Sequence, residues 1–277
     1  MILVTGATGN VGAELVRTLA GGGERVRALI RRDADRATLP AGVDAFVGDM
    51  NRPETLAGAV DGVSAIHLLS GYEGMDRLLA DARRARVERV VLQSSSAVPS
   101  GDMSNAVARY HILSERAVRD SGLGWTFLQP NSFMSNTLQW IPQLRAGDVV
   151  RAPFGDVPVA TIDPRDVAAI SARALTSSDH EGRSYRLSGP DSLLPADRVR
   201  TLGEVLGREL RFEGQSDVEA REEMLASMPA EYVDAFFSFF ADGKLDESEV
   251  RDTVERVTGR RPRSFQQWAS EHADAFR

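Results

Sequence analysis

The sequence predicts an α/β fold: a doubly wound parallel sheet with a smaller, mainly helical C-terminal lobe. An uncharged strand, a glycine-rich turn and a helix follow one another within the first twenty residues. Short apolar runs then alternate with helical segments as far as residue 92, a pattern typical of parallel sheets with right-handed crossovers. Beyond Pro195 the pattern becomes almost entirely helical.

The opening turn carries the clearest chemical signal. Residues 2–4 are apolar and uncharged, as expected of a buried parallel strand, and from Val11 the apolar residues repeat with the period of a helix. Gly6 permits a sharp turn, Gly9 a close approach of the backbone to a ligand, and Gly12 close packing of the helix. Free N–H groups and the helix dipole at this point favour phosphate binding. The turn therefore predicts a dinucleotide site formed by Gly6, Ala7, Thr8, Gly9, Asn10, Val11 and Gly12. Its GxxGxxG spacing differs from the usual GxGxxG, and the alternative is an ordinary turn.

The second strand, residues 26–30, bears on the choice of cofactor. An acidic residue commonly follows this strand and binds the ribose 2′-hydroxyl of NAD. Here Arg31 and Arg32 follow instead, and a guanidinium can bind a 2′-phosphate bidentately. The sequence therefore favours NADP(H) over NAD(H), with a solvated charged loop as the alternative.

Later strands are expected over residues 43–47, 63–69, 89–92 and 125–128, with helices over 53–60, 75–86 and 105–121 between them. The carboxyl ends of parallel strands form the ligand-binding edge of such a sheet. Further cofactor contacts are therefore expected from Asp49, Met50, Leu69, Ser70, Gly71, Ser94 and Ser95.

The segment after Pro130 is rich in large apolar and amide side chains, and it leaves the same edge of the sheet. We interpret it as the wall of a substrate pocket, with plain core packing as the alternative. The candidate substrate-binding residues are Asn131, Phe133, Met134 and Trp140.

A helix is expected to open near Asp163 and a strand at 185–187, followed by helices over about 195–206, 218–227, 229–241, 247–258 and 265–276 and a short strand at 210–212. Four phenylalanines at 236, 237, 239 and 240 indicate a helical core or a dimer contact, and a substrate lid is the alternative. The predicted division is a dinucleotide-binding Rossmann domain at 1–130, to which 161–188 returns, and a substrate-binding lobe formed by 131–160 and 189–277.

Composition restricts the classes of function. The 277 residues contain 42% hydrophobic and 26% charged residues, as globular proteins do, and the net charge of −7 argues against nucleic acid or an anionic membrane as the main partner. Cysteine is absent, the four histidines show no paired spacing, and no metal site is expected. No apolar run approaches the roughly 20 residues that span a bilayer. With a strand beginning at residue 2, we expect a cytoplasmic protein acting on a small molecule, with a homodimer as one open possibility.

Several motifs in order resemble the NmrA-like group of atypical short-chain dehydrogenases/reductases. They are VTGATGNVG at the start, HILSE and SGLGWTFLQP in the middle with FMSN just after, and ATIDPRDVA and YRLSGP later. The resemblance covers nearly the whole chain. It implies a Rossmann-type fold, NAD(P)H binding and an activity among the quinone, azo or ether reductases of that group, which also contains non-catalytic redox sensors.

The resemblance also implies two catalytic positions. Members of the wider superfamily carry a Tyr-x-x-x-Lys pair, and the matching positions here are Val107 and His111. The superfamily serine matches Ser96. We therefore expect Ser96 to orient the acceptor oxygen and His111 to supply or relay a proton. The alternative for His111 is a structural role.

The sequence thus favours hydride transfer from NADPH to an electron-poor acceptor such as a quinone or an aromatic polyketide-like metabolite, because such acceptors need little acid catalysis. Two alternatives remain open. One is a reductase of a single pathway metabolite, acting by enone reduction or epoxide opening. The other is a regulatory protein that senses NADP without turnover.

Overall fold

The computed structural model describes all 277 residues, which divide into two compact units. The first unit contains Met1–Val98, Arg109–Pro130 and Pro164–Arg186. The second contains Pro99–Ala108, Asn131–Asp163 and Leu187–Arg277. Residues 99–108, which the sequence-based division leaves in the first domain, thus cluster with the second.

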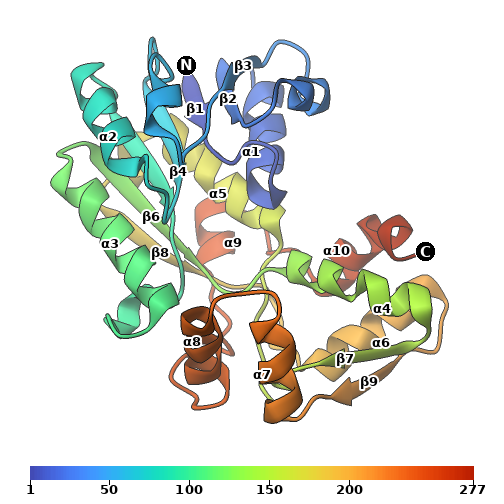
Figure 1. Cartoon of the computed structure of the whole chain (residues 1–277). Coiled ribbons are helices and arrows are strands. Elements are labelled where there is room, and N and C mark those ends of the chain that lie inside the picture. Colours follow the sequence, from blue (N-terminus) through green and yellow to red (C-terminus); the bar gives the residue numbers. More distant parts are fainter. The chain divides into compact units, whose positions relative to one another are not determined.

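The first unit is built on a seven-stranded sheet with the strand order β3-β2-β1-β4-β5-β6-β8 (Figure 1). All pairings from β3 to β6 are parallel. The strands are β1 (Ile2–Val4), β2 (Val26–Ile30), β3 (Asp44–Val47), β4 (Ala65–Leu69), β5 (Arg89–Gln93), β6 (Gly124–Pro130) and β8 (Arg183–Leu187). The chain reverses its direction of winding between β1 and β4, which are neighbours in the sheet. In open α/β sheets such a reversal opens a ligand-binding crevice beyond the carboxyl ends of the strands. The doubly wound α/β prediction is confirmed.

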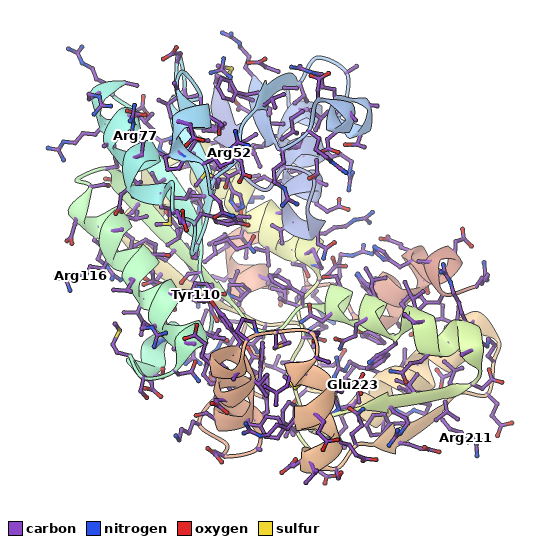
Figure 2. The ribbon with its side chains drawn as sticks, in the orientation of Figure 1. Arg52, Arg77, Tyr110, Arg116, Arg211 and Glu223 are labelled. Carbon is purple, nitrogen blue, oxygen red and sulfur yellow. The ribbon has the colours of Figure 1, made fainter.

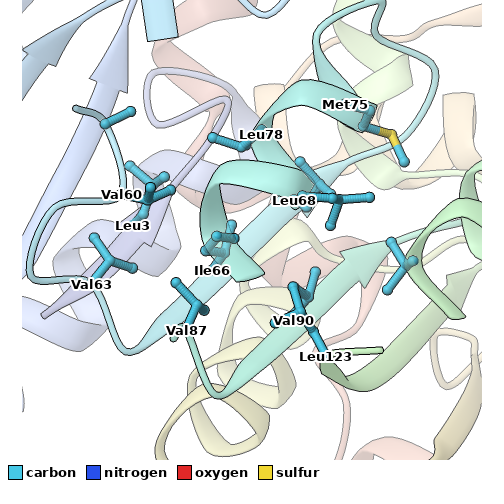
Figure 3. Packing of buried hydrophobic residues seen from close by; sticks show 14 of the residues in the cluster. Leu3, Val60, Val63, Ile66, Leu68, Met75, Leu78, Val87, Val90 and Leu123 are labelled. Carbon is cyan, nitrogen blue, oxygen red and sulfur yellow. The ribbon is translucent and has the colours of Figure 1, made fainter. Parts of the chain in front are cut away.

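Helices cover both faces of this sheet. Helix α1 (Asn10–Gly21) packs against α5 (Pro164–Thr176). On the other face, α2 (Met75–Arg84) and α3 (Ala106–Asp120) cover a buried apolar layer. Figure 3 shows this layer, in which Leu3, Ile66 and Leu68 of the strands meet Leu78 of α2. Strand β4 is buried on both faces, and because successive side chains of a strand point to opposite faces, its Ile66 and Leu68 both belong to this layer.

The second unit is mainly helical and has its own core. It contains the helices α4 (Ile141–Ala146), α6 (Pro195–Leu206), α7 (Asp217–Leu225), α8 (Ala230–Phe240), α9 (Thr253–Thr258) and α10 (Phe265–Glu271). Two short parallel strands, β7 (Val149–Ala152) and β9 (Arg211–Gly214), pair with each other. Val150 of β7, Val199 and Leu202 of α6 and Trp268 of α10 belong to one buried cluster. None of the helices in either unit is long and apolar enough to cross a membrane.

The structure corrects three of the expected elements. Helix α9 begins only at Thr253, so the helix expected over 247–258 is wrong in its first half. The reason is that the Glu247 carboxylate is buried and accepts hydrogen bonds from the backbone and hydroxyl of Ser132, which holds the segment in an extended form. The helix expected over 53–60 is a 3₁₀ turn over Pro53–Leu56, and the last expected helix breaks at His272. Strand β7 was not predicted.

Candidate cofactor and substrate sites

The glycine-rich turn has the geometry that its sequence predicts. Gly6 adopts a φ of 63°, a left-handed conformation that side chains disfavour, and the Gly9 N–H donates to its carbonyl over 2.9 Å. A Cβ on Gly12 would lie 2.0 Å from the Gly6 carbonyl oxygen. The turn and the first residues of α1 are therefore packed so closely that only glycine fits at position 12.

The start of α1 fits a diphosphate. Gly9 is its N-cap, no side chain caps the helix, and no acidic residue lies in the first turn. Thr8, Gly9 and Asn10 are exposed, whereas Ala7 and Val11 are buried in the packing beneath them. The positive end of a twelve-residue helix is thus exposed to solvent with neither a capping side chain nor a carboxylate that would compete with a phosphate.

The loops after β4 and β5 are fixed beside this turn. The Leu69 N–H donates to the Thr5 hydroxyl over 3.0 Å, and the Leu69 side chain lies against Gly6. The Ser70 hydroxyl donates to the Gln93 carbonyl over 2.8 Å, which ties β4 to β5. The Gly71 N–H donates to the hydroxyl of Ser114 on α3. The candidate residues Leu69, Ser70 and Gly71 therefore line the carboxyl edge of the sheet next to the glycine turn.

The two arginines after β2 differ in their contacts. Both are exposed, but the Arg32 guanidinium forms an ion pair with Asp35 at 2.7 Å. This pairing raises the pKa of Arg32 and lowers that of Asp35. Arg31 forms no hydrogen bond or ion pair and acts on Asp35 only as a more distant charge. Of the two, Arg31 is the guanidinium available to a ligand.

Asp49 and Met50, after β3, are held in different ways. The Asp49 carboxylate accepts from the Asn51 N–H over 2.9 Å, and its own N–H donates to the hydroxyl of Thr55. The Met50 side chain is 5% exposed and belongs to the core, while its carbonyl accepts from the Gly74 N–H. In this structure Met50 could therefore contact a ligand chiefly through its backbone.

A buried carboxylate organises the loop after β5. Glu115 of α3 is 1% exposed and accepts from the Ser94 hydroxyl over 2.7 Å and from Gln129 Nε2 over 2.8 Å. Arg119 Nη2 donates to its other oxygen over 3.1 Å. Ser95 accepts from the Ala97 N–H and shapes the turn that follows. The network joins β5, β6 and α3 at the edge where Ser94 and Ser95 are candidate cofactor contacts.

The two candidate catalytic residues lie in this same unit. Ser96 is buried, and its N–H donates to the Pro130 carbonyl over 3.0 Å. His111 lies on α3 with its ring centroid 4.1 Å from that of Tyr110, and its Nδ1 is buried without a hydrogen-bond partner. Burial lowers the pKa of His111 to about 3. His111 is therefore a neutral imidazole near pH 7. Tyr110, labelled in Figure 2, also packs against Gly71.

The second unit contains a cavity of about 600 Å³. Among the candidate substrate residues, Trp140 lines it. The other three do not line it. Met134 lies in the buried core, and Phe133 forms a backbone bridge with Ile162. The side-chain amide of Asn131 donates to the carbonyls of Ala160 and Glu247. The cavity also includes residues from α7 and α8; Glu223 of α7 is labelled in Figure 2.

The phenylalanines of α8 divide between two environments. Phe237 and Phe239 are buried, whereas Phe236 and Phe240 line the cavity. Two further lining residues, Arg198 and Thr161, were not singled out from the sequence. A usable signal was present for Arg198: it lies four residues before the buried Leu202 and beside the buried Val199, so it places a charge next to the apolar face of α6.

This fold and the glycine turn together are those of a dinucleotide-binding α/β protein. The sequence matches the NAD(P)H-binding family over residues 6–178, so the chain belongs to that family.

Two relatives align over almost their whole length. The (4-alkanoyl-5-oxo-2,5-dihydrofuran-3-yl)methyl phosphate reductase of Streptomyces griseus is 41% identical, covering 100% of this chain and 99% of the relative. The NAD(P)H azoreductase of Xenophilus azovorans is 33% identical, covering 100% of this chain and 99% of the relative. The resemblance inferred from the motifs is thereby confirmed, and the chain is a member of an NAD(P)H-dependent reductase family.

Among solved structures, the NADPH-dependent quinone oxidoreductase of Escherichia coli complexed with NADPH aligns with a TM-score of 0.80. The two sequences are 22% identical, and the alignment covers 98% of this chain and 99% of the quinone oxidoreductase chain. At this identity the similarity shows the fold.

Proposed function

We propose that this protein transfers a hydride from NADPH to an electron-poor carbon–carbon double bond conjugated with carbonyl groups. The observation that carries the proposal is the 41% identity, over both full lengths, to a reductase named for a 5-oxo-2,5-dihydrofuran. The ring in that name holds a double bond next to a lactone carbonyl, and the 4-alkanoyl group adds a second carbonyl. Quinones are a second candidate class, favoured by the quinone oxidoreductase among the relatives, which is 25% identical over 79% of each chain.

The residues around the glycine turn fit the cofactor. The N–H groups at the start of α1 would bind the diphosphate, and the edge residues after β4 and β5 would border the rest of the dinucleotide. When bound, NADPH supplies the hydride. The protein's own residues have to position the acceptor and to manage the proton.

The chain lacks the tyrosine of the usual acid pair, with Val107 and His111 at the two matching positions, and the proposed acceptor makes this tolerable. Charge that develops on an enolate or hydroquinone oxygen is delocalised over the conjugated system, so little acid catalysis is needed. Ser96 would hold the acceptor oxygen. With a pKa of about 3, His111 would serve as a neutral hydrogen-bonding group that passes a proton rather than as an imidazolium acid.

Steady-state oxidation of NADPH with three acceptors tests the proposal: a 3-acyl-2(5H)-furanone, menadione and an azo dye. We expect turnover with the furanone to exceed that with the dye. We expect His111→Ala to lower kcat by about tenfold, and the wild-type profile to show no titration of His111 between pH 5.5 and 8. An unchanged kcat in the variant removes the proton role. Absence of NADPH oxidation with every acceptor overturns the proposed function.

The preference for NADPH makes a separate prediction about Arg31. Because Arg32 is paired with Asp35 and Arg31 is not, Arg31→Ala should weaken NADPH binding by about tenfold, the effect of losing one charge-assisted contact. Binding of NADH, which has no 2′-phosphate, should change little.

Arg32→Ala is the matched control, with a smaller expected effect on NADPH. Titration calorimetry with both cofactors on the three proteins measures the difference. Equal losses for NADPH and NADH in Arg31→Ala would refute a 2′-phosphate contact.

A further inference from the structure

One cation in the cavity of the second unit has no counter-charge. The guanidinium of Arg198, in the first turn of α6, lines the cavity and forms no hydrogen bond or ion pair. Its Nε is buried without a partner, and the guanidinium lies over the ring of Trp140, whose centroid is 5.5 Å from Cζ. Stacking on an aromatic face leaves the edge of the guanidinium, with its N–H donors, available.

Arg200, on the same helix, differs from Arg198 in having a counter-charge. It is exposed and forms an ion pair with Asp197 at 3.0 Å. Burial of Arg198, by contrast, lowers its pKa to about 10, so its environment opposes the charge. Arg198 is half-buried and its Nε is fully buried, and a charge that is partly removed from water without a counter-charge is destabilised. A ligand that supplied the missing negative charge would relieve this cost.

Two more donors of the cavity also lack acceptors. Trp140 Nε1 and Thr161 Oγ1 are buried with no hydrogen-bond partner. The other charged lining residues are Arg151, which is paired with Glu219, and the exposed Glu223, which accepts from Gln215. The polar part of the wall therefore contains one guanidinium without an ion pair, Arg198, and two donors without acceptors. This combination is suited to an anionic oxygen group.

The rest of the wall is apolar. Phe154 contacts Phe240 with ring centroids 5.4 Å apart, and the apolar lining residues include Phe154, Met224, Met228, Phe236 and Phe240. Phenylalanine and methionine side chains of this kind adapt to a flexible alkyl chain. The volume of about 600 Å³ is in the range of cavities that hold small organic ligands.

We propose that Arg198 binds the anionic group, a phosphate monoester or a carboxylate, of a substrate whose alkyl portion packs on the phenylalanines and methionines of the same cavity. Trp140 holds the guanidinium in place, and Thr161 donates to the same anion. This inference rests on the proposed function, because it assigns the cavity to the acceptor. It adds the chemical class of the acceptor: an amphiphilic anion.

Calorimetric titration of the full chain, without cofactor, tests this assignment with three probes of equal chain length: octyl phosphate, octanoate and 1-octanol. We expect at least one anion to bind the wild type about tenfold or more tightly than octanol, as a charge-assisted contact gives. Arg198→Met keeps the aliphatic stem and the packing on Trp140 but removes the charge. It should bring the affinity for the anion close to that for octanol. The exposed Arg200→Met is the control and should behave as the wild type.

Tighter binding of octyl phosphate than of octanoate supports a phosphate monoester, and the reverse order supports a carboxylate. Equal affinity of the wild type for octanol and both anions overturns the inference, and so does an equal loss in Arg200→Met. Binding of octanol by Arg198→Met verifies that the variant is folded. If the variant does not fold, the comparison of the three probes on the wild type still tests whether the cavity prefers an anion. The binding test is independent of turnover. If the protein binds the anions more tightly than octanol but does not oxidise NADPH with any acceptor, the proposed function is wrong and the anion site stands.

Discussion

Replacing Gly12 by alanine is expected to weaken NADPH binding by about a hundredfold or more, equivalent to roughly 2.7 kcal/mol. The added Cβ would lie 2.0 Å from the Gly6 oxygen and 3.1 Å from the Ala7 Cα, and all of these atoms belong to the backbone. No rotamer change can relieve such a contact. Either α1 moves away from the turn or the turn opens, and both movements displace the N–H groups that would hold the diphosphate.

Gly21→Ala is the matched control, because it lies at the other end of the same helix and a Cβ there meets nothing within 4 Å. It should bind NADPH as the wild type does and should be slightly more stable, since alanine favours a helix over glycine. Calorimetry with NADPH and thermal unfolding of the cofactor-free proteins separate binding from folding. Wild-type affinity in Gly12→Ala would mean that the turn does not hold the cofactor.

The predictions that held for the fold rest on local signals. The strand at 2–4, the glycine turn and the helix that follows are contiguous in sequence, and each is specified by the residues within it. The alternation of apolar strands with amphipathic helices then leaves few topologies, because crossovers between parallel strands are right-handed. This is why the doubly wound sheet could be predicted from the sequence alone.

The errors concern segments held by distant partners. Residues 247–252 have a composition compatible with a helix, but Glu247 is bound by Ser132, 115 residues away in the chain. Strand β7 exists because Val150 pairs with Phe212 of β9, and neither short strand is stable without the other. A sequence window contains no information on such pairings.

The same distinction between local and distant contacts applies to the two candidate sites. The glycine turn is a local motif, so its residues could be proposed as cofactor contacts from the sequence alone. The cavity of the second unit brings together Trp140, Thr161 and Arg198 from three separate segments, and only Trp140 was anticipated. The distinguishing property of Arg198 is the absence of a counter-charge, which only the folded arrangement reveals.

Removing the buried carboxylate of α3 is expected to have the largest effect on stability. Glu115→Ala would leave three donors without their acceptor: the hydroxyl of Ser94, the amide of Gln129 and the guanidinium of Arg119. The first two are buried, and each unsatisfied buried group costs about 1–3 kcal/mol. We expect a loss of about 3 kcal/mol, which for a chain of this size lowers Tm by roughly 6–12 °C.

Two further variants make this expectation specific to the network. Glu115→Gln keeps the shape and one acceptor oxygen, so it should lose about half as much. Arg116→Ala, on the exposed side of the same helix with only a 3.6 Å surface pair to Asp120, should change stability by less than about 0.5 kcal/mol. Urea unfolding of the cofactor-free proteins gives the three free energies. If Glu115→Ala unfolds at the same urea concentration as Arg116→Ala, the carboxylate does not hold the edge of the sheet together.

Because Ser94 lies at that edge, a destabilised Glu115→Ala protein should also bind NADPH more weakly than Arg116→Ala.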